Sequence, residues 1–564
     1  MSAGAWQSAG PGSLAARNPA IGPERNRPYA LGHGIPSVAN AHPHSSGSIW
    51  VVHNGIIENH AELRIELQAL GYTFTSQTDS EVIAHLIAAH QQIGQDMLAT
   101  VRAACMRLRG AYAIAAMSDA EPGVIIGTRH GSPLVLGLGD GENYLASDTQ
   151  ALLSLTRRFI YLEDGDCVHL TASAARIHGA DGAPRLGAER QAEADNDIAE
   201  LGDYAHFMQK EIHEQPQALT RTLRGRLQNG HILHQLFEPD SEALLKATRS
   251  VHIVACGTSL YAGMVARHWI ESIAGIPCHT DVASEYRYGN TPTVAPGCLY
   301  LTITQSGETS DTLAALRHSR GQPYLTRLAI CNVAESSVAR EADVVLMTRA
   351  GPEIGVASTK AFTTQLAALA LLALELARAR DGHSLRIAAA IRELEQLPAL
   401  VERTLAMDAP IRALCLRFLG ANGALFLGRG ACHALALEGA LKLKEITYLH
   451  AEGFAAGELK HGPLALVDER IPVIALAPSN DLIFKLLSNV EEVRARGGRT
   501  IVFADEREAE RFSEFRVIAL PTSDEIGAPV VFAVALQLLA YHVAVLLGTD
   551  IDQPRNLAKS VTVE

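Results

Sequence analysis

Cysteine is scarce in this sequence and absent before Cys105. Only eight of the 564 residues are cysteine, none forms a C-x-x-C pair, and no histidine cluster has the spacing of metal ligands. The sequence therefore indicates neither a disulfide framework nor a zinc site, and no metal is expected. The N-terminus also lacks a basic leader with an apolar core, so no signal peptide is predicted and a cytoplasmic location is expected.

Apolar runs of membrane-spanning length without polar residues are missing too. The longest apolar stretch, 530–547, is interrupted by Gln537, Tyr541 and His542, which favours a buried helix over a membrane span. The formal net charge of -13 at pH 7 disfavours nonspecific nucleic-acid binding. We expect contact with neither a membrane nor nucleic acid.

The chain is too long for one core and predicts several domains. Short β-rich runs with two helical patterns occupy residues 48–180 and predict an α+β unit. Further on, a buried strand, a glycine turn and a helix occur twice, at 251–272 and at 424–445, which predicts a duplicated doubly wound α/β fold. Residues 1–31 are predicted to be disordered, residues 32–190 to form the α+β unit and residues 191–240 to be a linker. The first α/β copy is predicted over residues 241–383 and the second over residues 413–553, with a helical connection at 384–412 and a C-terminal tail at 554–564.

Hydroxyl-rich turns follow two buried strands of the first copy. They are Cys256-Gly257-Thr258-Ser259 and Thr304-Gln305-Ser306-Gly307-Glu308-Thr309, each directly before a predicted helix. Hydroxyls and free N–H groups at helix N-termini bind a phosphate dianion without a cation. The lysine of a nucleotide-binding P-loop is missing, so the sequence predicts a phosphate site rather than a triphosphate site.

The matching helix of the second copy carries Glu438, Lys442 and Glu445 on one face. Such a stripe is commonly an exposed face with salt bridges. Its entry turn places it at the ligand end of the sheet, where a carboxylate could move a proton between carbons and a lysine could polarise an oxygen. His461 and Lys559 lie in polar segments to which residue chemistry alone assigns no role.

A glycine turn also marks the first unit. The β-branched run that ends in His53-Asn54-Gly55 predicts a strand that stops at a turn and exposes backbone N–H groups beside an amide. Donors arranged in this way form an oxyanion pocket.

The run from Ser37 to the last residue resembles the glutamine–fructose-6-phosphate aminotransferase (isomerising) family. The motifs that carry the resemblance are HNGIIENH, QTDSEVIAHL, RGAYAI, GSPLVLGLG, ASD, MQKEIHEQP, ACGTS, QSGETSDT, EIGVASTKAFTTQ, EGALKLKE, GELKHGPLAL and DQPRNLAKSVTVE. The resemblance implies a class II glutamine amidotransferase domain of the N-terminal-nucleophile type, followed by two sugar-isomerase (SIS) domains. It implies synthesis of glucosamine 6-phosphate from fructose 6-phosphate and glutamine-derived ammonia, with no cofactor.

The resemblance also implies roles for individual residues. Glu445 would carry the proton between C1 and C2 with Lys442 beside it, His461 of a partner subunit would open the sugar ring, and Lys559 would form a Schiff base. A homodimer follows from the role of His461. The residues implied to bind the sugar phosphate are Thr258, Ser259, Thr304, Gln305, Ser306, Thr309, Val356 and Ser358, and those implied for the glutamine pocket are Asn54, Gly55, His42 and Asp79.

The sequence departs from the family before His33-Gly34. The family begins Cys-Gly-Ile, its cysteine being the nucleophile, and carries Thr-Arg-Trp-Ala-Thr before His-Gly. This chain begins MSAGAW and has PYALG there, and the family's first strand is not matched. We therefore expect the polypeptide as printed to have lost glutamine hydrolysis, either through an altered start upstream of about residue 32 or as a true variant.

Three alternatives follow from these features. The chain could use free ammonia only, it could simply isomerise hexose phosphates, or it could be a sugar-phosphate sensor without catalysis. A sensor needs the phosphate turns but not the set Glu445, Lys442, His461 and Lys559, so the synthase is favoured.

Overall fold

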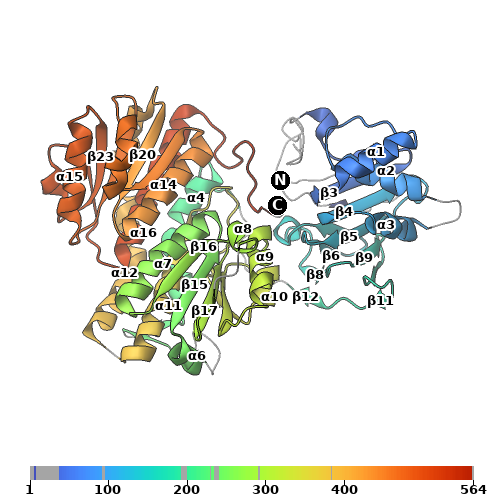
Figure 1. The fold of residues 1–564 in the computed structure, drawn as a ribbon, viewed down its shortest axis with the longest axis horizontal. Helices are drawn as coiled ribbons and strands as arrows, with labels where there is room; N and C mark the ends of the chain where they lie inside the picture. Colours follow the sequence, from blue (N-terminus) through green and yellow to red (C-terminus); the bar gives the residue numbers. More distant parts are fainter. Residues whose placement is uncertain are drawn as a thin grey trace. The chain divides into compact units, whose positions relative to one another are not determined.

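The computed structural model describes residues 6–7, 37–91, 96–191, 200–228, 230–233, 241–289, 293–382 and 384–561 (Figure 1). The chain divides into two units. Unit 1 comprises residues 1–198, 308–310 and 558–564, and unit 2 comprises residues 199–307 and 311–557.

Unit 1 contains two antiparallel sheets. The larger has the order β11-β10-β9-β5-β4-β3-β2 and the smaller the order β1-β7-β6-β8-β12. The strands are β1 (Trp6–Gln7), β2 (His44–Ser46), β3 (Ile49–Ile57), β4 (Gly110–Ser118), β5 (Ile125–His130), β6 (Val135–Leu138), β7 (Asn143–Ala146), β8 (Arg158–Tyr161), β9 (Cys167–Leu170), β10 (Ala175–His178), β11 (Pro184–Arg185) and β12 (Glu189–Gln191). The helices are α1 (His60–Ala69), α2 (Ser80–His90) and α3 (Met97–Cys105), with 3-10 turns η1 (Val38–Asn40) and η2 (Gln150–Leu152).

Alternating side chains divide the core of unit 1 between the two faces of the larger sheet. Ile114 and Ala116 of β4 pack with α1, α2 and α3. Ala113 of the same strand packs with Leu136 and Leu145 of the smaller sheet. This period of two is that of a strand buried on both faces.

Unit 2 contains two parallel sheets of five strands with the same connectivity. The orders are β16-β15-β17-β18-β19 and β21-β20-β22-β23-β24, so in each copy the second strand lies outside the first and the third lies on its other side. The strands are β13 (Leu227–Gln228), β14 (His231–Ile232), β15 (Ser250–Ala255), β16 (Cys278–Val282), β17 (Cys298–Ile303), β18 (Thr326–Cys331), β19 (Val344–Met347), β20 (Gly423–Gly428), β21 (His450–Ala455), β22 (Pro472–Ala477), β23 (Arg499–Asp505) and β24 (Arg516–Leu520). The duplicated doubly wound fold that the sequence predicts is confirmed.

Long helices pack the two copies around a shared core (Figure 1, green to red). The helices are α4 (Phe207–His213), α5 (Gln215–Leu223), α6 (Ser241–Ala247), α7 (Gly257–Ile273), α8 (Ala283–Tyr286), α9 (Ser310–Ser319), α10 (Ser337–Glu341), α11 (Lys360–Asp381), α12 (Leu385–Leu405), α13 (Asp408–Leu414), α14 (Ala431–Thr447), α15 (Ile483–Arg494) and α16 (Gly527–Leu547), with 3-10 turns η3 (Cys415–Phe418), η4 (Ala456–His461), η5 (Pro463–Leu466) and η6 (Ala509–Phe512). Helices α11 and α16 are long and apolar enough to cross a membrane by length and composition. Both are buried within unit 2, which is what the core helices of a globular domain require.

The structure differs from three sequence expectations. Residues 207–223 of the expected linker form helices α4 and α5, whose Met208, Ile212 and Leu219 are fully buried in unit 2. Of the expected disordered segment 1–31 the described residues include only Trp6–Gln7, which pair with β7 as strand β1. Strand β3 does not stop at Gly55 but runs on to Ile57, because its pairing with β4 continues to Gly110.

Candidate active site

The two hydroxyl-rich turns lie at neighbouring strand ends in unit 2. Strands β15 and β17 are paired in parallel, with Ala255 opposite Ile303, so the turns that follow them share one edge of the sheet. This is the point where the strand order of a doubly wound sheet reverses and where ligands bind. The structure thus brings Thr258 and Ser259 to the same edge as Thr304, Gln305 and Ser306.

The second turn depends on a glycine. Gly307 has a φ of +68°, and a Cβ added to it would lie 1.9 Å from Oγ of Ser336. Thr304 is buried, and its Oγ1 accepts a hydrogen bond from the Gly307 N–H at 3.1 Å. The carbonyl of Gly307 in turn accepts from the N–H of Val338 at 3.0 Å. Glycine is required here for its backbone conformation and for the close approach of Ser336.

A buried charge cluster lies on α14. Nζ of Lys442 is 2.7 Å from Oε2 of Glu445 and 3.7 Å from Oε1 of Glu438, and Lys442 and Glu438 are nearly inaccessible. Burial raises the pKa of Glu438 to about 8, although the positive charge of Lys442 opposes this shift. Burial alone would lower the pKa of Lys442, but Glu445 and Glu438 together raise it. Lys442 therefore remains a cation near neutral pH, and Glu438 is largely protonated.

One hydrogen bond joins this cluster to the phosphate turns. Oγ1 of Thr258, at the start of α7, donates to Oε1 of Glu438 at 3.3 Å. Beside it, Oγ of Ser259 accepts from Nε2 of Gln365 on α11 at 3.0 Å. The first copy thus contributes the hydroxyl turns and the second copy contributes the acid–base groups, within one cluster of contacts.

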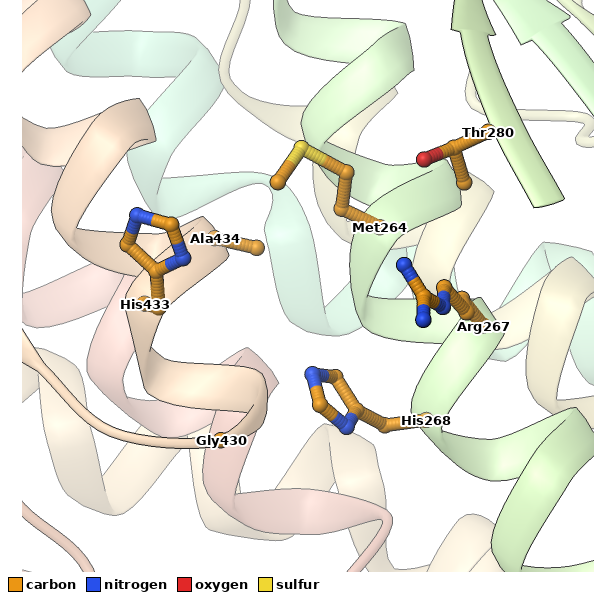
Figure 2. Close-up of a pocket in the computed structure, with 7 residues that line it drawn as sticks. All are labelled: Met264, Arg267, His268, Thr280, Gly430, His433 and Ala434. Atoms are coloured by element: carbon orange, nitrogen blue, oxygen red, sulfur yellow. The ribbon is translucent and has the colours of Figure 1, made fainter. Parts of the chain in front are cut away.

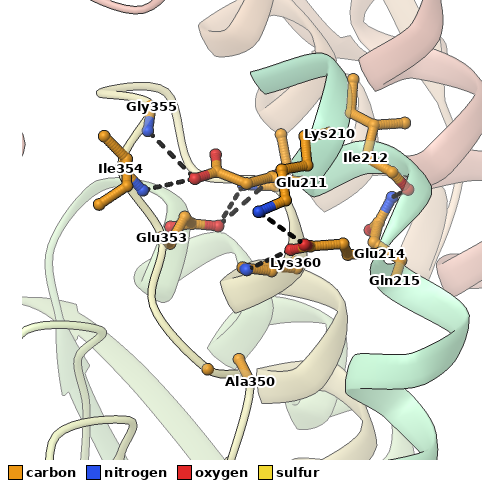
Figure 3. Close-up of polar contacts among 12 residues, drawn as sticks. Lys210, Glu211, Ile212, Glu214, Gln215, Ala350, Glu353, Ile354, Gly355 and Lys360 are labelled. Carbon is orange, nitrogen blue, oxygen red and sulfur yellow. Dashed lines mark hydrogen bonds and ion pairs between the residues drawn. The ribbon is translucent and has the colours of Figure 1, made fainter. Parts of the chain in front are cut away.

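Buried carboxylates shape the loop that holds Val356 and Ser358 (Figure 3). Glu353 is completely buried; its Oε1 accepts from the N–H groups of Thr359 and Ala361 at 2.9 and 3.0 Å, and its Oε2 accepts from Oγ of Ser358 at 3.2 Å. These bonds cap the N-terminus of α11, where a negative charge is favourable.

Helix α4 and the C-terminal segment hold the other end of this loop. Oε1 of Glu211 accepts from the N–H groups of Ile354 and Gly355 (Figure 3). The carbonyl of Asp552 accepts from the N–H of Val356 at 3.1 Å, and the Asp552 carboxylate accepts from the N–H groups of Phe207 and Met208. The loop that holds Val356 and Ser358 is therefore fixed by segments that are far apart in the sequence.

The remaining predicted residues of the sugar site are placed separately. His461 ends the turn η4 and is exposed. Thr309 and Lys559 are grouped with unit 1, where the N–H of Ser310 donates to the carbonyl of Val561 at 3.0 Å. The structure thus brings together the hydroxyl turns, the charge cluster and the loop of unit 2.

In unit 1 the predicted glutamine-pocket residues gather around strand β3. Asn54 and Gly55 lie within β3, and a Cβ on Gly55 would lie 2.1 Å from the carbonyl oxygen of Ala111. Oδ2 of the buried Asp79 accepts from the N–H of Ile57 at 2.8 Å, which fixes the start of α2 against the strand.

Neutral histidines accompany this cluster. Burial, with His44 and His53 nearby, lowers the pKa of His42 to about 3. Burial also lowers the pKa of His53 to about 4, opposed by the charge of Asp79, and Nδ1 of His53 is 2.9 Å from Oγ of Ser80. Both imidazoles are uncharged near neutral pH and can donate or accept hydrogen bonds.

Comparison with known proteins places these features in a family. A glutamine amidotransferase domain matches residues 35–154, and SIS domains match residues 244–375 and 418–547. The chain is 53% identical over 538 residues to a glutamine–fructose-6-phosphate aminotransferase (isomerizing) of Pseudomonas aeruginosa, covering 94% of this chain and 87% of that protein. The corresponding protein of Haemophilus influenzae is 51% identical over 534 residues, again covering 94% and 87%.

The chain belongs to the glutamine–fructose-6-phosphate aminotransferase family. A solved structure of the C-terminal domain of the glucosamine-fructose-6-phosphate aminotransferase from Francisella tularensis matches with a TM-score of 0.61 and 48% identity, over 63% of this chain and all of that one. The resemblance inferred from the motifs is confirmed, as is the fold class of an amidotransferase domain followed by two SIS domains.

Sequence reasoning on this aminotransferase chain missed the residues that support the site. Glu438 was visible as part of a polar helical stripe, but its bond to Thr258 joins residues 180 positions apart. Glu211 and Glu353 gave no local signal, because they accept from backbone N–H groups that a sequence does not distinguish. Only burial identifies them as structural carboxylates.

Proposed function

We propose that this chain makes glucosamine 6-phosphate from fructose 6-phosphate, with nitrogen from glutamine or ammonia. The observation that carries the proposal is the buried cluster of Glu438, Lys442 and Glu445, linked by the Thr258 hydroxyl to a phosphate-type turn. A sugar phosphate held at that turn places its reacting carbons near a carboxylate and a cation. This pair suits proton transfer next to a carbonyl group.

The sugar phosphate is held by neutral donors in this proposal. Hydroxyls and turn N–H groups bind the phosphate dianion, and the loop fixed by Glu353 lines the sugar. Preformed turns of this kind lose little entropy on binding. The binding residues proposed are Thr258, Ser259, Thr304, Gln305, Ser306, Thr309, Val356 and Ser358.

The chemistry then proceeds through an imine. His461, contributed by the partner subunit of a homodimer, opens the ring, and the neutral amine of Lys559 attacks C2 with loss of water. Ammonia displaces the lysine from C2. Glu445 removes a proton from C1 and returns one to C2, which leaves an aldehyde at C1 and an amine at C2, while Lys442 stabilises the negative charge that develops on oxygen.

Unit 1 is proposed to provide the nitrogen for this reaction. Asn54 and Gly55 are proposed to stabilise an oxyanion, and His42 and Asp79 to line the glutamine pocket. The two cysteines of unit 1 are poor nucleophiles, since burial raises the pKa of Cys105 and Cys167 to about 12. Neither cysteine is therefore proposed as the nucleophile for glutamine, and the proposed nitrogen source stays glutamine-derived ammonia, in a cytoplasmic enzyme without a cofactor.

The test is product formation from fructose 6-phosphate with either ammonium or glutamine as the nitrogen source. Glucosamine 6-phosphate from ammonium, at a rate that falls at least about a hundredfold in Lys559→Ala, is the expected result. Formation from glutamine at a comparable rate would show that unit 1 supplies the ammonia, and product from ammonium alone would show that it does not.

Two other outcomes separate the alternatives. No product from either source, with fructose 6-phosphate still bound and binding unchanged in Lys559→Ala, would favour a sugar-phosphate sensor. Interconversion of hexose phosphates without nitrogen transfer would favour a simple isomerase.

A further inference from the structure

A cavity of about 160 Å³ lies between α7, β16 and the start of α14 in unit 2 (Figure 2). Arg267 and His268 reach it from α7, Thr280 from β16 and His433 from α14, where Gly430 begins the helix. None of these residues belongs to the proposed active site. Three basic side chains that face one concavity from two helices are a feature that the reaction leaves unexplained.

The internal duplication shows that the fold does not need these polar side chains. Gly257 and Gly430 occupy the same place in the two copies and both have a positive φ, +52° and +57°. In that register His433 corresponds to Leu260, Arg267 to Ala440 and His268 to Leu441. Each of these three basic residues therefore has an apolar counterpart in the other copy. The polar lining is specific to this position.

The charges of the cavity suit an anion. Nε of Arg267 is 3.1 Å from Oε1 of Glu271, which orients the guanidinium and neutralises part of its charge. Burial and the charge of Arg267 lower the pKa of His268 against the opposing effect of Glu271, and burial and His268 lower the pKa of His433. An oxyanion between the rings would offset their mutual repulsion and receive their N–H groups.

The volume of the cavity limits which anions it can hold. A water molecule occupies about 30 Å³ of liquid and a drug-sized ligand needs about 300 Å³ or more. The cavity is thus large enough for a phosphate or sulfate group but too small for a nucleotide. A metal ion is disfavoured, because the described residues include no group of three metal-binding side chains and Arg267 adds positive charge.

We propose that this cavity is a second oxyanion site, in which Arg267, His268 and His433 bind the phosphate or sulfate group of a small metabolite. The helix dipole of α14, whose N-cap is Gly430, adds to the favourable potential. The site stands independently of the synthase reaction proposed above.

Sulfate is the probe of choice, because it remains a dianion across the range in which histidines titrate. Ring ¹³Cε1–¹H signals of the full chain are followed during sulfate titration at constant ionic strength, with chloride as the reference anion. His268→Leu and His433→Leu, which install the residues of the other copy, assign the two signals. Both signals should shift along one saturable curve, and the dissociation constant should rise about tenfold in Arg267→Gln.

The pH dependence provides a second readout. The groups that face the two imidazoles are Arg267 and Glu271 on α7 and Thr280 on β16, besides each other. Because the bound dianion favours the protonated rings, the affinity should increase as the pH falls from about 7.5 to about 6. An affinity independent of pH in this range would contradict the role of the two histidines.

Binding at the phosphate turns must be separated from binding here. The shifts should persist with the same dissociation constant in Thr258→Val, which removes a turn hydroxyl. Shifts that grow linearly with sulfate, match those in chloride, or persist unchanged in Arg267→Gln would overturn the proposal. Repeating the titration with inorganic phosphate and with a hexose 6-phosphate then distinguishes a free ion from an esterified phosphate by which one binds more tightly.

Discussion

At the residue scale, Lys442 is the buried cation of the charge cluster on α14. It is buried beside Glu438 and the partly buried Glu445, and its pKa is raised by both against the effect of burial. Removing one member of a buried ion pair leaves an uncompensated charge. The side chain is therefore expected to matter for stability as well as for catalysis.

Lys442→Met should lower the free energy of unfolding of unit 2 by about 3–5 kcal/mol. The matched control is Lys444→Met on the exposed face of the same helix, for which a change within about 0.5 kcal/mol is expected. Urea denaturation of both variants measures the difference. Equal effects would mean that the buried cluster is not held by its central cation.

Glu445→Gln tests the proposed proton transfer. The amide keeps the size of the side chain but cannot accept the C1 proton, so kcat with ammonium should fall by about 10²–10⁴-fold while fructose 6-phosphate still binds. Initial rates and a binding titration measure the two effects. A loss of binding with an unchanged kcat would assign Glu445 to substrate positioning instead.

At the scale of single elements, the turn after β17 and the loop before α11 determine the shape of the site. The hydroxyls of the turn were predictable from the pattern of apolar strand, turn and helix, whereas the loop was implied only by the resemblance to the family. Their supports were not predictable, because Glu211 binds residues 143 and 144 positions away. Helices α4 and α5 fall within the expected linker, although Met208, Ile212 and Leu219 recur at helical spacing and are fully buried, so this apolar pattern was missed.

Strand β3 shows the limit of turn chemistry in sequence. Asn-Gly after a β-branched run usually ends a strand. Here Gly55 serves a close approach to Ala111 while the pairing with β4 continues on both sides. Local preference was overridden by the partner strand, which lies more than 50 residues further on.

Gly307→Ala should disrupt the second phosphate turn. The methyl group would collide with Ser336, in addition to the cost of a left-handed backbone of about 1–2 kcal/mol. Gly257→Ala is the control, because its φ is also positive but no atom lies within 4 Å of the added Cβ. Thermal unfolding and the KM for fructose 6-phosphate should change more in Gly307→Ala, and Ser336→Gly should restore part of the loss.

Glu353→Gln should weaken the sugar-lining loop. The variant loses the charge that accepts from Thr359 and Ala361 and presents an NH₂ group to a site that needs an acceptor, so we expect a cost of about 1–3 kcal/mol. The KM for fructose 6-phosphate should rise more than kcat falls. Glu395→Gln, on the separate helix α12, serves as a control, and equal KM values in the two variants would refute the positioning role.

At the scale of the whole molecule, the stability of unit 1 is expected to depend on pH. His53 is neutral in folded unit 1 with a pKa of about 4, against 6.5 when unfolded. The unfolded state therefore binds more protons below about pH 6.5, and the stability of unit 1 decreases as the pH falls from there toward about 4. The loss from this one side chain reaches roughly 2 kcal/mol near about pH 5.

Calorimetry of the full chain should therefore show two transitions. The first, from unit 1, moves to lower temperature on acidification, and the second, from unit 2, moves to higher temperature when fructose 6-phosphate is added. In His53→Gln the first transition should depend less on pH between about 6.5 and 5. An unchanged slope would show that His53 is not the group responsible.

The hydrogen bond between Thr258 and Glu438 has a consequence for how this duplicated architecture can change. Strands β15 and β20 begin two copies of one design, and the bond joins Thr258 of one copy to Glu438 of the other. Because each copy contributes different groups to the proposed site, neither copy can substitute for the other. Under the proposed function, neither copy could be replaced by a duplicate of the other without losing either the hydroxyl turns or the acid–base residues. The two copies are therefore expected to be inherited together.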